Sequence, residues 1–474
     1  MTNRRGEAPP AVRSVASPTP EDAVAATIES RNPWSQEQVY AADAATSAQV
    51  ASAVERASLA QPDWSDRPVA ERAELLNGVA DEVTRAAADL TALIVAEVGK
   101  LHEEAAAEVA WMATSARWYA QHPPTETPEG KAQVRRAPLG VVAAITPWNV
   151  PLVTPAWKWL PALIAGNTVV WKPSERATGT ATAAHELASR AGVPDDVLAL
   201  VPGDATTATT LCADVGVDGV HFTGSTAAGR AISRQVADRF VRCSLEMSGI
   251  NLAVVFADAD VEAAAAAIVA SATAINGQKC SAVRQVLVER KVEAALVEAI
   301  ADRVRELEPG DPADPATRLG PLIHPAAAES ARTAVDRSLS QGARLVTRSP
   351  EISDVASAFP ATVLLHLSAA DPLRTSELFA PVLAVESFDD RDTVWDRAND
   401  TPFGLTAAVH TMNPDLMDTA VKRLRTGVVA FNRRSDDVAL EAPFAGRKAS
   451  GNGPPEGGTY VYEGLTAWQA VYGR

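Results

Sequence analysis

The stretch TVVWKPSERATGTATAAHELASRAGVPDDVLALV, residues 168–201, places two short apolar runs on either side of a helical segment. We expect residues 168–171 and 197–201 to form strands and residues 178–191 to form a helix between them. A strand, helix and strand in this order are typical of parallel strands joined by a crossover helix. The stretch therefore predicts an α/β fold with a parallel sheet covered on both faces.

The same alternation extends over most of the chain. Residues 46–120 carry apolar side chains at helical spacing. Further strands are expected at 141–145, 219–222, 243–245 and 252–256, with helices at 227–237 and 261–274. A second series then predicts strands at 286–288, 344–346, 362–365, 382–385, 405–410 and 428–431, with helices at 292–307, 325–341 and 392–398. The pattern predicts two α/β units.

Bulk properties exclude several kinds of partner. The chain has 474 residues and a formal net charge of −16, so we expect two or three domains and no binding to nucleic acid or anionic membranes. The three cysteines are too few for a disulfide framework and suit a reducing compartment. The seven histidines form no metal-binding motif.

Neither the N-terminus nor any apolar run predicts membrane insertion or export. Residues 1–20 lack an apolar segment and are expected to form a flexible tail, not a secretory signal. The longest apolar run, 263–275, is too short to span a bilayer. We therefore expect a soluble, cytoplasmic protein.

Three side chains beside predicted strands or helices are candidates for catalysis. Cys280 follows a helix in NGQKCS and could act as a thiolate nucleophile, although a lone cysteine is more often a buried apolar residue, as we expect for Cys212 and Cys243. Glu246 ends a strand and could be a general base or a solvated carboxylate. Asn149, in PWNVP, could donate to an oxyanion or form a turn.

Two segments could bind a nucleotide. Lys172 and Glu175 in WKPSE could hold the two ribose hydroxyls, which would favour a free 2′-hydroxyl, or they could form a surface ion pair. In FTGSTAAG, Ser225 or Thr226 could cap a helix whose first amides bind phosphate. This segment is not a GxGxxG motif, so a plain helix cap remains the alternative. ELFAP and PFAGRKASG have no chemical interpretation from their residues alone.

The order of seven motifs, PWNVP, WKPSE, FTGSTAAG, EMSG, GQKC, ELFAP and PFAGRKASG, resembles that of the NAD(P)-dependent aldehyde dehydrogenase superfamily from about residue 30 to the end. The resemblance implies oxidation of an aldehyde to an acid through a cysteine thiohemiacetal and thioester. It implies Cys280 as nucleophile, Glu246 as general base, Asn149 as oxyanion donor, and Lys158 with Glu456 as a proton relay. The implied cofactor-binding residues are Thr146, Pro147, Trp148, Lys172, Ser174, Glu175, Gly203, Phe222, Thr223, Gly224, Ser225, Gly229, Met247, Glu377 and Phe379.

The resemblance also implies a domain plan. A Rossmann-type cofactor-binding domain would comprise 21–117 and 139–248, a catalytic domain 249–448, and a small β oligomerisation element 118–138 and 459–474. The expected cofactor is NAD, with NADP possible, and the expected assembly is a homodimer or homotetramer. Three family segments differ here: EMSGI stands for ELGGK, and Ala380 and Ala445 stand for glycines in the other two.

Other functions and the choice of substrate stay open from the sequence. A coenzyme-A-acylating enzyme would not need Glu246, and a non-catalytic family member would not need to keep Cys280, Glu246 and Asn149. In the loop 432–441, arginines could clamp a carboxylate and aspartates could hold an amine, or these charges could lie on a solvated rim. CSA at 280–282 and PEGG at 455–458 resemble semialdehyde-oxidising branches, so a polar semialdehyde is our hypothesis.

Overall fold

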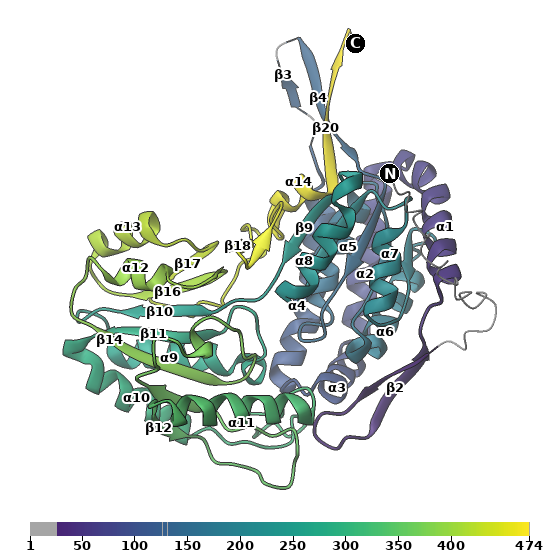
Figure 1. Ribbon diagram of the computed structural model, residues 1–474. Coiled ribbons are helices and arrows are strands. Elements are labelled where there is room, and N and C mark those ends of the chain that lie inside the picture. Colours follow the sequence, from purple (N-terminus) through teal and green to yellow (C-terminus); the bar gives the residue numbers. More distant parts are fainter. Residues whose placement is uncertain (1–25, 126, 130, 474) are drawn as a thin grey trace, which may run out of the picture.

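The computed structural model describes residues 26–125, 127–129 and 131–473. The tail predicted at 1–20 lies outside the described residues. Figure 1 shows two α/β units side by side, with a narrow β arm projecting from one of them. This arrangement confirms the predicted α/β fold with two sheets.

The first sheet has six strands in the order β19-β9-β8-β5-β6-β7. Their bounds are β5 Val141–Ile145, β6 Thr168–Lys172, β7 Leu198–Leu200, β8 Gly219–Thr223, β9 Arg242–Glu246 and β19 Gly451–Asn452. The pairs from β9 to β7 are parallel, and β19 joins β9 antiparallel from the distant C-terminal segment. The opening stretch forms β6, α6 and β7, as predicted.

Helices cover both faces of this sheet. Their bounds are α1 Ser47–Asp66, α2 Val69–Arg85, α3 Ala87–Val98, α4 His102–Gln121, α5 Val153–Ile164, α6 Thr178–Arg190, α7 Ala205–Ala213 and α8 Thr226–Val236. In β5, Val141, Ala143 and Ile145 face the core under α1, α7 and α8. Val142 and Ala144 face the core under α2, α4, α5 and α6. The two-residue alternation of a strand thus joins two separate cores.

Two helices of this unit were not predicted. Nearly every residue of α5 is buried, so it carries no polar face whose periodicity marks an amphipathic helix. It also contains Pro155 and Pro161, which argue against a helix in isolation. The other, α7, is rich in threonine, a weak helix former, and begins at a cap in which Asp204 accepts from two backbone amides.

The second sheet has seven strands in the order β12-β13-β14-β11-β10-β16-β17. Their bounds are β10 Asn251–Val255, β11 Val283–Glu289, β12 Arg344–Arg348, β13 Thr362–Leu365, β14 Val382–Phe388, β16 Thr406–His410 and β17 Val428–Phe431. Its helices are α9 Val261–Thr273, α10 Glu293–Arg305, α11 Pro325–Ser340, α12 Val394–Asn399 and α13 Pro414–Arg423. All the strands and all the helices except α13 were predicted.

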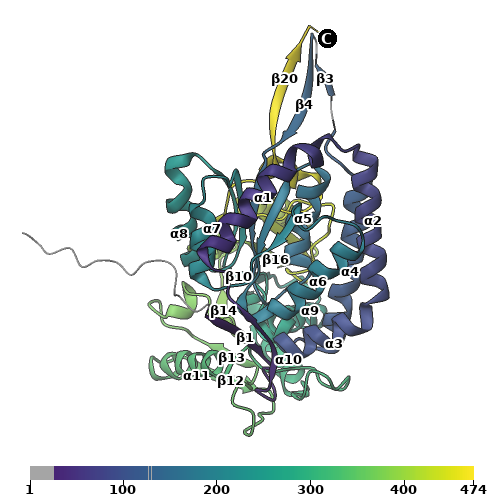
Figure 2. The ribbon, with the colours of Figure 1, turned by 90° about the vertical axis from the view of Figure 1, so that its right-hand side faces the viewer.

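The projecting arm is a three-stranded antiparallel sheet of β3 Thr127–Glu129, β4 Ala132–Pro138 and β20 Thr466–Tyr472, with β4 in the middle. Figures 1 and 2 show it extending away from the rest of the molecule in both views. The first part of the β element predicted at 118–138 begins later, because residues 118–121 complete α4. The strand in its second part, predicted at 459–474, also starts later, after η6 Gly458–Val461 and α14 Tyr462–Leu465.

Two further strand pairs were not predicted. They are the hairpin of β1 Thr27–Arg31 with β2 Gln38–Asp43, and the short pair of β15 Phe403–Gly404 with β18 Arg447–Lys448. No helix in the described part of the chain combines the length and apolar character needed to cross a bilayer.

Candidate active site

Cys280 lies in a loop whose backbone is bent by three successive residues with left-handed conformation. The short helix η3 Ala274–Gly277 follows α9, and Ile275, Asn276 and Gly277 have φ values of 51°, 54° and 77°. A Cβ atom at Gly277 would lie 2.3 Å from the backbone nitrogen of Pro381. Glycine is therefore required at this position. The bend carries Cys280 toward the carboxyl ends of the first sheet.

A cavity of about 80 Å³ contains Cys280 and several predicted catalytic residues. Glu246 reaches it from the end of β9, and Glu456 reaches it from the C-terminal segment. The lining residues are Trp111, Val150, Val153, Thr154, Trp157, Thr223, Glu246, Met247, Lys279, Cys280, Ser281, Val438, Phe444 and Glu456. We call this space the inner cavity.

The Cys280 thiol is held in its protonated form in the free protein. Burial and the carboxylate of Glu377 raise its pKa to about 12, while the neighbouring Lys279 ammonium opposes this rise. Cys212 is buried and Cys243 is half-buried. Burial raises their pKa values to about 12 and about 11, which fits the passive apolar role predicted for both.

Glu246 is a buried carboxyl group, not a solvated one. Its side chain is 3% exposed, and Oε2 accepts a hydrogen bond of 2.9 Å from the backbone amide of Gly446. Burial, with help from nearby Glu456, raises the pKa of Glu246 well above its usual range. A carboxylate with a raised pKa is the stronger base, as activation of water requires.

Lys158 and Glu456 are in direct contact, as the resemblance predicted. Lys158, on α5, is fully buried, and its ammonium group donates to Glu456. The hydroxyl of Thr223 completes the triangle: it accepts from Lys158 Nζ at 2.7 Å and donates to Glu456 Oε1 at 3.1 Å. Thr223 was predicted only as a cofactor contact, and its hydroxyl belongs to this network.

Asn149 connects two loops of the site. It is 6% exposed, and its Nδ2 donates a 2.9 Å hydrogen bond to the carbonyl of Gln278. That carbonyl lies two residues before Cys280. The side-chain amide of Asn149 is thus fixed next to the Cys280 loop, and its second N–H remains for a ligand.

Lys172 is buried at the carboxyl end of β6. No hydrogen bond of its ammonium group exists within the described residues, and burial lowers its pKa, opposed by Glu175 and Asp204. Glu175 is more exposed, 41% for its side chain, and its nearest cation is Arg176 at 4.0 Å. Ser174 caps the short helix η1 Glu175–Ala177. The alternative of a surface ion pair between Lys172 and Glu175 is therefore wrong.

The N-terminus of α8 is capped by Ser225, whose hydroxyl oxygen accepts from the Ala228 amide at 3.2 Å. The helix cap predicted for this segment is thus confirmed. Within the described residues, the amides of Thr226 and Ala227 have no acceptor. Such free first-turn amides form an anion-binding site.

The glycines around this helix allow close packing. A Cβ atom at Gly224 would lie 2.6 Å from the ring of Phe222. At Gly229 it would lie 2.4 Å from the sulfur of Met247, and at Gly203 it would lie 2.0 Å from Thr207 Oγ1. These predicted cofactor-binding glycines therefore also hold the strand ends together.

The remaining predicted cofactor residues surround the Cys280 loop and the end of β5. Glu377 accepts from the Gly249 amide at 3.2 Å, and burial raises its pKa to about 7. Phe379 meets Trp148 edge to face at 5.8 Å between ring centres. Thr146 accepts from the Trp171 indole at 2.9 Å, and Pro147, half-buried, follows it.

Ala380 and Ala445 are the two alanines that stand where the family pattern has glycine. Ala380 is fully buried in an apolar cluster with Val382 and Leu364, and its carbonyl accepts from the Arg284 guanidinium at 2.8 Å. The carbonyl of Ala445 lies so close to Gly427 that a Cβ atom there would be 1.5 Å away.

The comparison with known families decides the identity of this site. A model described as the aldehyde dehydrogenase family matches residues 20–471.

The chain belongs to the aldehyde dehydrogenase family.

Relatives and solved structures agree with this assignment. The chain is 36% identical to a probable succinate-semialdehyde dehydrogenase [NADP(+)] of Sinorhizobium fredii, over 85% of this chain and 84% of that one. It is 33% identical to the lactaldehyde dehydrogenase of Escherichia coli, over 89% of each chain. A crystal structure of lactaldehyde dehydrogenase from Escherichia coli matches with a TM-score of 0.90 at 30% identity, over 94% of this chain and 95% of that one.

Like other aldehyde dehydrogenases, this one is an oxidoreductase that converts aldehydes to carboxylic acids with NAD(P). The described residues fit a nicotinamide dinucleotide. The buried Lys172 ammonium and the first amides of α8 have no hydrogen-bond partner within the described part of the chain, and they are suited to hydroxyl and phosphate oxygens. By contrast, no group of three potential metal ligands occurs among the residues that the structure describes.

A second cavity of about 430 Å³ adjoins the inner cavity of this aldehyde dehydrogenase. The two share Trp111, Val150, Lys279 and Val438 in their walls. The full lining of this outer cavity is Lys100, Glu104, Ala107, Glu108, Trp111, Val150, Ala274, Ile275, Lys279, Arg434, Asp436, Asp437 and Val438. Sequence reasoning missed the residues from α4. Their only signal was the spacing of Glu104, Glu108 and Trp111, which places them on one helix face.

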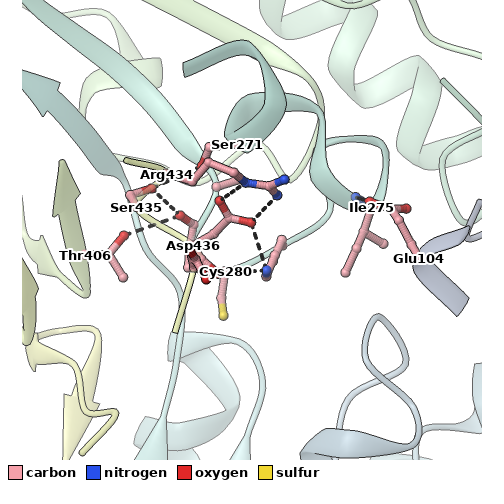
Figure 3. Close-up of polar contacts among 12 residues, drawn as sticks. Glu104, Ser271, Ile275, Cys280, Thr406, Arg434, Ser435 and Asp436 are labelled. Atoms are coloured by element: carbon pink, nitrogen blue, oxygen red, sulfur yellow. Dashed lines mark hydrogen bonds and ion pairs between the residues drawn. The ribbon is translucent and has the colours of Figure 1, made fainter. Parts of the chain in front are cut away.

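The loop 432–441 contributes a charged cluster to the outer cavity, shown in Figure 3. Asp436, 3% exposed, accepts from Arg434 at 2.7 Å and from the Lys279 ammonium at 2.9 Å. These two cations, with the hydrogen bonds from them, lower the pKa of Asp436 to about 2 despite its burial. These side chains form a wall of the cavity, so the alternative of a wholly solvated rim is wrong for Arg434 and Asp436. The solvated rim describes Arg433, whose exposed side chain pairs with Asp437, a half-exposed residue at the lining of the outer cavity.

Proposed function

We propose that this aldehyde dehydrogenase oxidises a semialdehyde that carries a carboxylate, with Cys280 as the nucleophile. The supporting observation is the charge of the outer cavity wall. Arg434 and Lys279 share one carboxylate, Asp436, so these three groups together carry a net charge of +1 on this part of the lining. A substrate carboxylate would be attracted there while its aldehyde reaches Cys280. The similarity to a probable succinate-semialdehyde dehydrogenase supports this substrate class.

The chemistry begins at Cys280. Its thiol loses a proton, and the thiolate attacks the aldehyde carbon to form a thiohemiacetal. The oxyanion accepts from the Asn149 side-chain amide and from the Cys280 backbone amide, and removing one such donor typically costs about 10²–10³ in rate. A bound nicotinamide dinucleotide would supply the two-electron acceptor for the hydride that the thiohemiacetal carbon gives up. The carbon and sulfur are then joined as a thioester.

Hydrolysis then requires a base. Glu246 takes a proton from water, and the resulting hydroxide attacks the thioester carbon. The carbon–sulfur bond breaks, the free acid leaves, and the Cys280 thiolate is restored. Thr223 and Glu456 line the same inner cavity, and the network that they form with Lys158 carries the proton away from Glu246.

We propose that NAD is preferred over NADP. Lys172 and Glu175 would hold the adenine ribose, and the Glu175 carboxylate would repel a 2′-phosphate. The α8 amides beside Ser225 would bind the pyrophosphate. Glu377 would hold the nicotinamide ribose, with Phe379 and Trp148 beside the ring.

The assembly and domain plan are also part of the proposal. We expect a homodimer or homotetramer formed through the arm, which carries exposed Trp468 and Tyr472 on its edge strand β20. The cofactor-binding domain would comprise 21–117 and 139–248, and the catalytic domain 249–448. Three free cysteines suit a reducing compartment, so we expect a cytoplasmic location.

A substrate panel tests the proposal. With NAD, succinate semialdehyde and glutarate semialdehyde should give NADH with a higher kcat/KM than butanal. Cys280→Ala should form no NADH, and the control Cys243→Ala should stay active. Arg434→Met should raise KM for succinate semialdehyde about tenfold or more, from loss of a charge-assisted contact, and leave butanal unchanged. The neighbouring Arg433→Met is the matched control.

Butanal as the better substrate, or equal effects of both arginine variants, would refute the carboxylate proposal. A product that forms only with added coenzyme A, as an acyl thioester and not as a free acid, would refute hydrolysis by Glu246.

A further inference from the structure

We infer that Glu104 is a specificity-determining residue that binds an ammonium group on the substrate, which makes the preferred substrate an amino-acid semialdehyde. The inference rests on the proposed function for the carboxylate end. Glu104 lies in the first turn of α4 and lines the outer cavity. Its Oε1 accepts from the Ile275 amide at 2.8 Å, whereas its Oε2 is buried and has no hydrogen-bond partner among the residues that the structure describes. Figure 3 shows Glu104 beside Ile275, apart from the Arg434–Asp436 cluster.

The other acidic groups inside this cavity are already paired. Glu108 forms a buried ion pair with Lys100, and its other oxygen accepts from the amides of Leu152 and Val153. Asp436 is shared by two cations. Glu104 therefore has the one carboxylate oxygen of these three residues that lacks a hydrogen-bond donor, and a buried acceptor in that condition is unfavourable until a ligand supplies one.

The charges of the cavity are complementary to a zwitterion. Arg434 and Lys279 carry a surplus positive charge on one side, and Glu104 offers a carboxylate on another. Burial raises the pKa of Glu104, opposed by Lys100, Lys279 and Arg434, and an ammonium group against Oε2 would favour the ionised form. A semialdehyde with a carboxylate alone would leave Oε2 unpaired. One that also bears an α-ammonium group satisfies both ends.

Three aldehydes separate the two recognition points. Aspartate semialdehyde and succinate semialdehyde differ only in the amino group, and aminopropanal has the amino group without the carboxylate. The wild-type enzyme should turn over aspartate semialdehyde with a kcat/KM about tenfold or more above that of succinate semialdehyde, as expected for a buried charged hydrogen bond. Glu104→Gln keeps an acceptor for Ile275 and should remove this advantage by raising KM for the amino substrate. The exposed neighbour Glu103→Gln is the matched control and should keep it.

The outcomes are distinct. Succinate semialdehyde as the equal or better substrate of the wild-type enzyme overturns the role of Glu104 and leaves the carboxylate proposal intact. If aminopropanal has the highest kcat/KM of the three aldehydes, the role of Glu104 in binding an ammonium group is supported and the carboxylate proposal is overturned. If Glu104→Gln lowers kcat/KM equally for aspartate semialdehyde and succinate semialdehyde, the inference is overturned as well. If that variant fails to fold, as judged by thermal melting, the wild-type ratio and Glu104→Asp decide in its place.

Discussion

Cys280 is surrounded by some groups that raise its pKa and by one that lowers it. Burial and the carboxylate of Glu377 stabilise the thiol, and the Lys279 ammonium stabilises the thiolate. Lys279 is in turn fixed by the side chain and the carbonyl of Asp436, at 2.9 and 3.1 Å. The reactivity of the nucleophile therefore depends on Asp436, a residue of the loop 432–441 that lies 156 positions away from Cys280 in the chain.

The first prediction concerns thiol reactivity. Because the pKa of Cys280 is raised to about 12, its alkylation by iodoacetamide should accelerate with pH throughout the neutral range, about tenfold per pH unit. Lys279→Met removes the one cation that lowers this pKa, so its alkylation should be several times slower at equal pH. Lys291→Met, at an exposed position, should react like the wild type. Equal rates in Lys279→Met and the wild type would contradict the electrostatic role.

A second prediction concerns Glu246. Glu246→Gln should retain a first-turnover burst of NADH and lose about 10²–10⁴ in steady-state rate, because only hydrolysis needs the base. The raised pKa of Glu246 means that it is protonated, and inactive as a base, until the pH exceeds that value. The steady-state rate of the wild type should therefore rise as the pH passes through this pKa. The slow steady-state rate of Glu246→Gln should not show this rise. Added hydroxylamine should partly restore turnover, and a variant without a burst would refute this division of steps.

At the scale of elements, the parallel strands β5, β6, β8 and β9 end at one edge of the first sheet, and the chemistry is arranged along that edge. Lys172 is the last residue of β6, and Glu246 is the last residue of β9. A parallel sheet brings the carboxyl ends of strands together, so residues far apart in the chain become neighbours there.

The third prediction tests the β6 end of this edge. The wild-type kcat/KM should favour NAD over NADP by about tenfold or more, because Glu175 would repel a 2′-phosphate. Glu175→Ala should lower this ratio of kcat/KM values, mainly by raising kcat/KM with NADP. Glu186→Ala, on the exposed side of α6, should leave the ratio unchanged. An equal preference in the wild type, or no change in Glu175→Ala, would show that Glu175 does not select the cofactor.

At the scale of the whole molecule, the arm is a part that has few contacts with the two α/β units of its own chain. It extends away from both α/β units (Figures 1 and 2), and its edge strand β20 has free hydrogen-bonding capacity on one side. Trp468 is 55% and Tyr472 72% exposed. Exposed aromatic side chains on an open strand edge are typical of a surface that pairs with another chain.

The fourth prediction follows from this exposure. The wild-type protein should have the mass of a dimer or tetramer by light scattering, and the double variant Trp468→Glu with Tyr472→Glu should shift it toward smaller species. Leu59→Glu, an exposed apolar residue of α1, is the matched control and should not. A monomeric wild-type protein would refute an oligomerisation role for the arm.

Local patterns sufficed to predict most elements, but only some of the positions that line the two cavities. The alternation of apolar runs and helical segments predicted both sheets, because strands and helices have different side-chain periods. The family resemblance predicted Cys280, Glu246 and Glu456, which line the inner cavity, and it predicted Lys158, which contacts Glu456. Helix α5 was missed because its burial on all sides leaves no periodic pattern.

The tertiary structure alone decided the surroundings of these side chains. Lys158 and Glu456 are separated by 298 positions, and their contact depends on how α5 packs against the C-terminal segment. The raised pKa values of Cys280 and Glu246 arise from desolvation, which is a property of everything packed around them. The unpartnered oxygen of Glu104 beside the cavity could not be predicted either, because whether a polar atom finds a partner is settled only when distant segments pack together.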